Sequence, residues 1–411
     1  MLRLRSYLTV ALFICVTTIG PSRADWPGFL GPAGNGVLIE ASAPLDFAPS
    51  KEGSPAKNIA WRTSLPGRSV SGPIIVGGKV ITTSSSGMEG RWLHVSAVDA
   101  ESGKVQWTRA SKATGRPYCH PTSANAAPTP CTDGQRVFAF FSSNDLVCYD
   151  LDGQLQWYRG LSYDHPQAGN DVGMSSSPLV VDGTVIVMID CQADSFATGI
   201  DTVTGVTKWE IARPHKANWS SPRLATAADG SQVVVLQGAD ELIGIDAATG
   251  KQLWLLDAKC STVASAVFSK GKLHVPASGT KTYELKTASE TPQLLWESSR
   301  INPNSSSPLV TDIGVLGLNR TVLVCCDEKG ELKWQSRLGD AGQFWATPVV
   351  AGQHMYAFAM NGKCFTIQLS DTSGEVVATS ELGEDVLGSP AIHGNAIFVR
   401  SVGSLWKLAK D

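Results

Sequence analysis

The stretch AVDAESGKVQW (97–107) and its near copy GIDAATGKQLW (244–254) share an apolar strand, an Asp, a Gly and a closing Trp at the same spacing. A chain that repeats such a block is built from an array of similar units. Weaker copies end at Trp157, Trp209, Trp296 and Trp334, so the six copies together fall about 38 to 52 residues apart. This period predicts propeller blades of four strands each.

The spacing inside the block has a physical reason. The Gly allows a tight reversal between two strands, and the Asp side chain accepts hydrogen bonds from the turn. The Trp then stands at a fixed place in the following strand, where a large side chain serves the packing of one blade on the next. We predict this docking role for Trp61, Trp107, Trp157, Trp209, Trp254, Trp296 and Trp334.

A second pattern runs in phase with the first and marks the inner hairpin of each blade. It consists of a small residue, usually followed by Pro, then an apolar run, a Gly-containing turn and another apolar run. Copies begin at Ser71, Ala126, Ser176, Ser220, Ser265, Ser306, Ala346 and Gly388. Eight hairpins predict an all-β, eight-bladed propeller.

The last blade lacks its outer strand because the chain stops soon after SLWKLAKD (404–411). The stretch NIAWRTSLPG (58–67) carries Trp61 ahead of the first hairpin and can supply the missing strand. We therefore expect the N-terminal strand to pair with the C-terminal blade and close the ring, which leaves no free central edge. The seventh blade has Val377 where a Trp should stand, so we expect looser packing there.

The N-terminal end has the pattern of a secretory signal. Arg3 and Arg5 precede an apolar run (7–19), and small residues fit cleavage after Ala24. The predicted organisation is a signal peptide (1–24), a Gly- and Pro-rich lead segment (25–57) and one propeller (58–411). We expect an exported protein, periplasmic or extracellular, with no stable membrane span after cleavage; a retained anchor is the alternative.

Charge and cysteine content narrow the function classes. Removing residues 1–24 leaves 31 Lys and Arg against 37 Asp and Glu, so nothing attracts nucleic acid. Export would make the remaining eight cysteines possible disulfide partners. The alternative is that most of these cysteines are unpaired and serve as small buried packing residues. Their connectivity does not follow from the sequence.

On these blocks the chain resembles the PQQ-like (pyrroloquinoline quinone repeat) β-propeller family over nearly all of residues 58–411. The resemblance implies one of two functions. Non-enzymatic members are similar to the BamB-like outer-membrane assembly factor. The other members are quinoprotein dehydrogenases, which bind pyrroloquinoline quinone together with calcium. Their calcium is held by carboxylate and amide side chains, and two consecutive cysteines lie in a loop over the quinone. The pair Cys325–Cys326 lies instead on a strand that leads toward Trp334.

We therefore expect no cofactor and a protein-binding or scaffolding role, with an envelope or secreted protein or peptide as partner. The alternatives are a quinoprotein oxidoreductase that binds pyrroloquinoline quinone with calcium, and a glycan-binding module. No catalytic motif of the common hydrolase, zinc or nucleotide-binding types is present, and no metal is predicted.

The candidate site is the channel mouth, where the loops that enter the innermost strands gather. Two of these loops are long and polar, and long loops between short strands usually carry function. The alternative is that their Asn, Ser and Pro serve turn geometry. The candidate ligand-binding residues are Arg116, His120, Asn125, His165, Asn170, Asp171, His215, Asn218, Trp219, Asn302, Asn304, Gln343 and Trp345.

Overall fold

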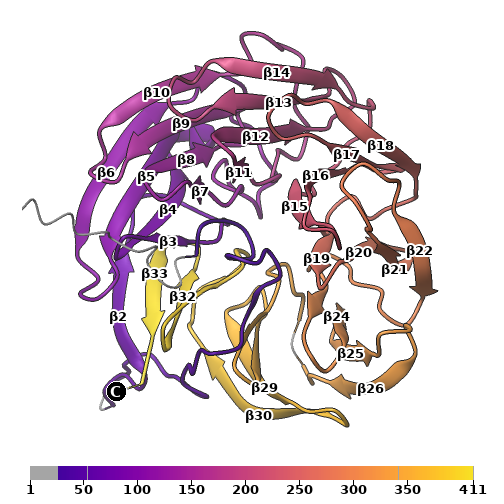
Figure 1. Ribbon diagram of the computed structural model, residues 1–411. Coiled ribbons are helices and arrows are strands. Elements are labelled where there is room, and N and C mark those ends of the chain that lie inside the picture. The colour runs from indigo at the N-terminus through magenta and orange to yellow at the C-terminus, as the bar shows by residue number, and fades with distance from the viewer. Residues whose placement is uncertain (1–25, 53, 341, 411) are drawn as a thin grey trace, which may run out of the picture.

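The computed structural model describes residues 26–52, 54–340 and 342–410, and these residues form eight separate sheets arranged in a ring (Figure 1). The predicted fold class is confirmed: the protein is an all-β, eight-bladed propeller. The predicted signal peptide (1–24) lies outside the described residues.

Each blade runs from an innermost strand outward. The first four blades consist of β3 (Ile74–Val76), β4 (Lys79–Ser86), β5 (Trp92–Asp99) and β6 (Val105–Lys112); β7 (Cys131–Thr132), β8 (Arg136–Phe140), β9 (Asp145–Asp150) and β10 (Leu155–Gly160); β11 (Leu179–Val181), β12 (Thr184–Ile189), β13 (Phe196–Asp201) and β14 (Thr207–Ala212); β15 (Arg223–Thr226), β16 (Gln232–Gln237), β17 (Glu241–Ile245) and β18 (Gln252–Asp257). A short 3-10 helix, η1 (Met88–Gly90), lies in the β4–β5 hairpin.

The other four blades follow the same order. They consist of β19 (Val267–Ser269), β20 (Lys272–Ala277), β21 (Gly279–Glu284) and β22 (Gln293–Ser298); β23 (Leu309–Val310), β24 (Val315–Asn319), β25 (Val322–Cys326) and β26 (Leu332–Arg337); β27 (Val349–Ala351), β28 (His354–Phe358), β29 (Lys363–Leu369) and β30 (Gly374–Glu381); β31 (Ala391–His393), β32 (Ala396–Arg400), β33 (Ser404–Leu408) and β2 (Ile59–Ser64).

β2 is the outermost strand of the eighth blade although it precedes the first blade in the chain. It lies antiparallel to β33, with Trp61 opposite Lys407 and Ser64 opposite Ser404. The C-terminus accordingly lies beside this strand in Figure 1. The eighth blade thus combines a strand that precedes the first blade with the last three strands of the chain.

The docking tryptophans explain the turn glycine of the repeated block and the glycine with which the copies 199–209 and 244–254 begin. A Cβ on Gly199, opposite Trp209 in the same blade, would come within 2.2 Å of the indole, and one on Gly250, in the turn of the next blade, within 2.6 Å. Gly250 also has a φ of +69°, which glycine adopts without strain. The indole is therefore held between the glycines of two neighbouring blades.

Most docking tryptophans also bond across the blade boundary. The indole N–H of Trp209 donates to the carbonyl of Ala247 at 2.9 Å, and the same bond recurs in five other blades. Trp296 differs, because its buried indole nitrogen has no hydrogen-bond partner among the described residues. This polar contact is therefore missing between the fifth and sixth blades, and also between the seventh and eighth, where Val377 replaces the Trp.

Residues of the lead segment occupy the boundary between the seventh and eighth blades. The ring of Phe47 stacks on Phe358 at a centroid distance of 6.1 Å, and its backbone N–H donates to Ser380. Together with Ala41 and Ala43, Phe47 belongs to the largest cluster of buried apolar side chains. Lead-segment residues thus occupy this boundary, Val377 itself is 39% exposed, and the looser packing expected beside it stays a prediction.

A preceding stretch of the lead, 26–38, passes through the centre of the ring and is called the channel segment here. Trp26 pairs with Ile75 on the innermost strand of the first blade, and the carbonyl of Pro27 accepts from Thr132 in the second. At its other end β1 (Val37–Leu38) adds a parallel fifth strand to the seventh blade. The indigo segment can be followed across the open centre in Figure 1.

The cysteines of the described residues do not form disulfides. All eight in the described part of the chain are free, and six of these are buried. Cys325 and Cys326 point to opposite faces of β25, into different apolar clusters. Within the described residues, no helix has the length and apolar character needed to cross a membrane.

The fifth blade contains a buried histidine that makes stability depend on pH. Burial lowers the pKa of His274 from 6.5 to about 4, and its Nδ1 lies 2.8 Å from the Thr282 hydroxyl. His274 therefore binds a proton more tightly in the unfolded chain than in the folded protein. Its titration does not reduce the free energy of unfolding above pH 6.5, and reduces it progressively as the pH drops toward 4. We compare the free energy of unfolding of His274→Gln with that of the unsubstituted protein, by urea unfolding at about pH 7.5 and about pH 4.5. We expect this difference to shift by about 2.5 kcal/mol in favour of the variant at the lower pH, because the unsubstituted protein is destabilised there and the variant is not. A constant difference between the two proteins would show that His274 is not the titrating group.

Candidate functional site

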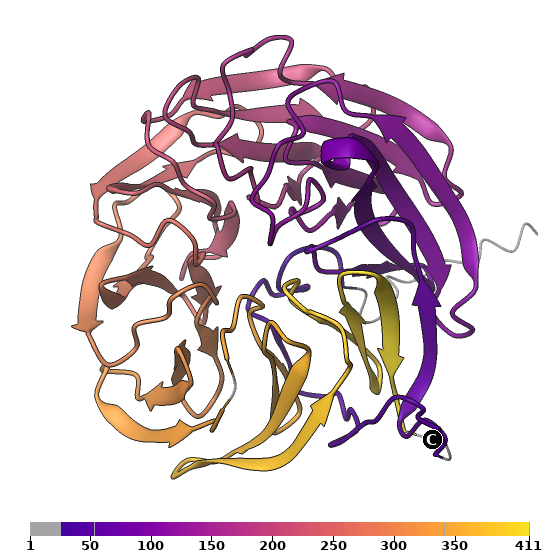
Figure 2. The same ribbon diagram turned by 180° about the vertical axis from the view of Figure 1, so that it is seen from behind.

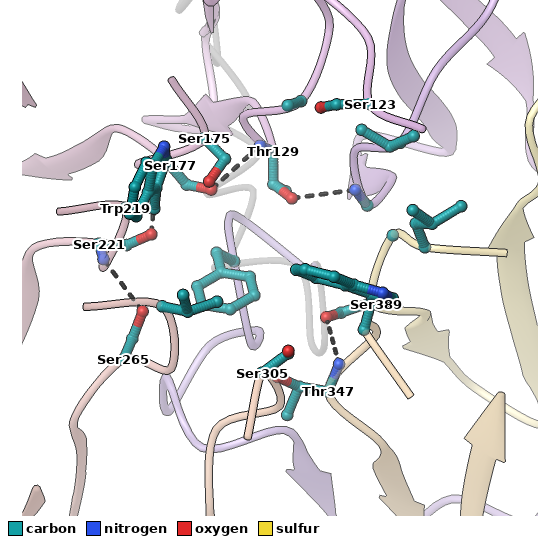
Figure 3. Close-up of a pocket in the computed structure, with 18 of the residues that line it drawn as sticks. Ser123, Thr129, Ser175, Ser177, Trp219, Ser221, Ser265, Ser305, Thr347 and Ser389 are labelled. Carbon is teal, nitrogen blue, oxygen red and sulfur yellow. Dashed lines mark hydrogen bonds between the residues drawn. The ribbon is translucent and has the colours of Figure 1, made fainter. Parts of the chain in front are cut away.

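The channel widens into a cavity of about 430 Å³ on the face that carries the β4–β5 hairpin, the face seen in Figure 2. We call this cavity the funnel. Its wall is built from the segments that enter the innermost strands, and residues of several blades therefore face one another around it (Figure 3). The volume is in the range of small-ligand sites in proteins.

A ring of hydroxyl groups, here called the hydroxyl ring, encircles the channel at the base of the funnel. In seven of the eight blades, the backbone N–H at this position donates to the side chain of the equivalent residue in the next blade, at 2.9 to 3.0 Å; several of these bonds are drawn in Figure 3. The accepting residues are Thr129, Ser177, Ser221, Ser265, Ser307, Thr347 and Ser389. The first blade has Gly72 at this position, where a Cβ would meet the Ser389 carbonyl at 2.5 Å.

The channel segment closes the funnel from below. Phe29 lines the cavity, and its carbonyl accepts a bond from Arg223 at 3.1 Å. A second bond from the same guanidinium reaches the carbonyl of Gly34. Gly31 is required within this segment, since a Cβ there would lie 2.7 Å from the Trp26 ring. The site is consequently a blind funnel that opens on one face.

Two tryptophans stand in the funnel wall. Trp219 is half-buried and donates its indole N–H to the carbonyl of Gly173 at 2.7 Å. Trp345 is 43% exposed, and no hydrogen bond to its indole nitrogen is found among the described residues. Exposed aromatic surface beside a cavity is typical of a binding site.

A buried ionic network fixes the loop that carries Trp219. Asn218 donates to Asp190 at 3.1 Å, and two nitrogens of Arg213 bond the same carboxylate at 3.1 Å. Arg213 also reaches Glu241 in the next blade at 2.8 Å. Burial raises the pKa of Asp190, although Arg213 and Asn218 favour its charged form. The network links the third and fourth blades directly behind the funnel wall.

Of the thirteen residues predicted for the site, the structure places His120, Trp219 and Trp345 in the funnel wall. Asn125 is instead buried, where it donates to the Gly90 carbonyl and accepts from the N–H of Ser143. Asn170 donates to the backbone carbonyl of Asp190, and Asn218 donates to its carboxylate. These three amides hold loops in place.

The remaining predicted residues lie on the surface outside the funnel wall. Arg116 and Asp171 form an exposed pair at 3.5 Å. His165 stacks on Phe196 at 3.8 Å between ring centroids and lies 3.1 Å from Glu210. The others are exposed: His215, Asn302, Asn304 and Gln343.

Our reading of the sequence missed the hydroxyl ring, although a signal for it was present. In the hairpin pattern, the residue immediately before the Pro is Ser or Thr in six of the eight copies, and Ser265 holds the same place without a Pro. We had described these residues only as small. Their bonds join residues of different blades that lie 40 to 57 positions apart, and no local pattern shows such bonds.

The funnel offers little acid–base or metal chemistry. His120 is the single titratable side chain among the described residues that line it, and it is exposed. The described part of the chain contains no group of three or more His, Cys, Asp and Glu that could hold a metal. Calcium takes about six to eight oxygen ligands, carboxylates among them. The lining has neither carboxylates nor side-chain amides, so it does not fit the calcium-dependent quinone site of the dehydrogenases.

Comparison with known proteins gives a family match over the first half of the propeller. A family model described as outer membrane protein assembly factor BamB matches residues 54–193 and 167–267, which together span 214 of the 411 residues. A polyvinylalcohol dehydrogenase from Sphingopyxis sp. (strain 113P3) is 25% identical over 232 residues. That match covers 56% of this chain but only 28% of the dehydrogenase.

Solved structures of a BamB protein and of a quinohemoprotein dehydrogenase share the fold of this chain. BamB from Moraxella catarrhalis superposes with a TM-score of 0.63 at 16% identity, over 85% of this chain and 97% of that one. Quinohemoprotein alcohol dehydrogenase from Comamonas testosteroni superposes with a TM-score of 0.64 at 12% identity, over 94% of this chain and 81% of that one. At these identities the likeness concerns the fold alone.

Proposed function

Because the chain belongs to the PQQ-repeat propeller family whose model is described as outer membrane protein assembly factor BamB, we propose that it is an exported, non-catalytic binding propeller. Its partner is an envelope or secreted protein, and a segment of that protein enters the funnel. No step of this function requires a cofactor.

One observation carries the proposal: the funnel is blind, flanked by two tryptophans, and lined by hydroxyl and apolar groups without acid or base pairs. General acid–base catalysis needs a titratable group positioned within reach of the reacting atoms. A neutral cavity with aromatic walls suits the binding of a polypeptide segment, whose apolar side chains contact the indoles and whose polar groups meet the hydroxyls. The channel itself already holds a segment of this chain, which pairs with innermost strands at Trp26 and at Val37–Leu38 and makes turns between these two points.

Removal of the exposed tryptophan tests the binding role. We expect Trp345→Ala to weaken binding of a pool of random hexapeptides at least tenfold, since aromatic anchors in binding sites contribute about 2 kcal/mol or more. Binding is measured by calorimetric titration of the purified protein. Trp92→Ala is the matched control, because Trp92 is similarly exposed, at 48%, but does not line the funnel. Equal losses in both variants would contradict a site in the funnel.

The enzyme alternative is tested in the same titration. The names of two similar proteins include dehydrogenases, so pyrroloquinoline quinone with calcium is a necessary probe. We expect neither stoichiometric binding of the quinone nor dye-linked oxidation of alcohols or sugars. Tight binding accompanied by turnover would replace the scaffold proposal with a quinoprotein oxidoreductase.

A further inference from the structure

The hydroxyl ring has unused donors. Each ring oxygen accepts a hydrogen bond from the neighbouring blade, so its own hydrogen is free to donate. Within the described chain, none of the seven hydroxyls has an acceptor at hydrogen-bond distance for this hydrogen; the bonds they make are the seven that they accept. The ring therefore presents O–H donors toward the funnel.

Six of the seven donors are buried and Ser389 is half-buried, and buried donors without acceptors are costly. Ser221, Ser265 and Thr347 are only 4%, 3% and 2% exposed. Leaving a buried polar group unsatisfied costs about 1–3 kcal/mol, which is why such groups are nearly always paired. All seven hydroxyl residues line the funnel, so a water molecule or a ligand group within it completes their bonding.

A buried cation lies against Phe29, which lines the funnel. Arg223 bonds two backbone carbonyls of the channel segment, and its guanidinium carbon lies 5.5 Å from the centre of the Phe29 ring. Within the described residues, the partners of its guanidinium are these backbone carbonyls, and none is a carboxylate. Burial lowers the pKa of Arg223 to about 10, which still leaves it charged at neutral pH. A buried cation without a counter-ion favours an anion nearby, because the local dielectric is low.

We propose that the funnel recognises a carboxylate, and that this carboxylate is the C-terminal end of the bound polypeptide. The inference rests on the proposed function and specifies which part of the partner enters. Free hydroxyl donors and the cation beside Phe29 both favour a negatively charged acceptor, while the lining holds no carboxylate that would repel it. The closed floor admits the end of a chain and excludes a chain that must pass through.

The test compares two peptide pools that differ only at their ends. N-acetylated random hexapeptides with a free C-terminal carboxylate and the same peptides as C-terminal amides are titrated calorimetrically into the protein, with sodium acetate as a third probe. We expect the acid pool to bind at least tenfold more tightly than the amide pool, because hydrogen bonds to a charged acceptor are stronger than neutral ones. Acetate binds at least a hundredfold more weakly than the acid pool, since it lacks the rest of the peptide.

Ring variants locate the recognition. The double variant Ser221→Ala, Ser265→Ala removes two adjacent donors and is expected to lower the affinity for the acid pool about tenfold, leaving the amide pool unchanged. The double variant Ser221→Thr, Ser265→Thr keeps both hydroxyls and keeps the affinity. Threonine fits this position because Thr129 and Thr347 already occupy it in other blades.

The outcomes separate this inference from the proposed function. Equal binding of both pools overturns carboxylate recognition but leaves the peptide-binding role standing, whereas no binding of either pool overturns both. Acetate that binds as tightly as the acid pool overturns the chain end as the source of the carboxylate. The comparison of the pools on the unsubstituted protein decides the question even where the alanine variant does not fold.

Discussion

Replacing Trp209 by alanine is expected to lower the free energy of unfolding by about 3 to 5 kcal/mol, the usual cost of emptying a large buried aromatic site. Trp209 is only 7% exposed, and its indole N–H bonds the carbonyl of Ala247 in the next blade. The substitution leaves a void between Gly199 and Gly250, neither of which has a side chain to fill it. Urea unfolding followed by circular dichroism measures the change in midpoint.

Trp296→Ala is the internal comparison for this prediction. Trp296 is half-buried and its indole nitrogen has no partner in the described chain, so we expect a loss of about 2 kcal/mol, smaller than that of Trp209→Ala. An equal or larger loss at Trp296 would show that the bond across the blade boundary contributes little to docking.

Arg213→Ala is expected to cost about 3 to 5 kcal/mol, because it leaves the Asp190 carboxylate buried without its cation. The Asp190 and Arg213 side chains are 2% and 0% exposed, and the pKa of Asp190 is already raised by burial, so the charge has no access to solvent. The Asn218 loop loses its anchor in the same step, and peptide binding beside Trp219 should weaken as well. Both effects are measured on one protein, by urea unfolding and by calorimetric titration.

Two comparisons isolate the buried charge as the cause. Lys270→Ala breaks a pair with Asp312 whose side chains are 63% and 74% exposed, and it should change stability by less than about 0.5 kcal/mol. The double variant Arg213→Met, Asp190→Leu removes both charges and should recover part of the loss. A double variant less stable than Arg213→Ala would mean that packing rather than charge dominates this site.

The architecture follows from the sequence because its determinants are local and repeated. The spacing of Asp, Gly and Trp in 244–254 depends on one turn and one docking position, and eight in-phase hairpins fix the number of blades. The path of the channel segment could not be derived in this way. It is held by backbone groups and by single contacts such as that of Phe29 with Arg223, which leave no periodic trace.

The site was only partly predictable for a related reason. Trp219 and Trp345 could be placed at the channel mouth, since the loops that carry them enter innermost strands. Residue type alone does not show whether an Asn bonds a ligand or a loop, and Asn125 and Asn218 prove to bond loops. The importance of the hydroxyls appears only when blades distant in the chain are brought together.

The pairing of β2 with β33 has a consequence for the order of folding. The sheet that joins them contains Ile59 opposite Leu408, so the last blade cannot form until nearly the whole chain has been synthesised. Contacts so distant in sequence form late, because closing the intervening loop costs entropy. The channel segment precedes β2 and lies inside the finished ring, so the growing blades assemble around it. We therefore expect the chain to remain open, and accessible to chaperones and proteases, until its final residues arrive.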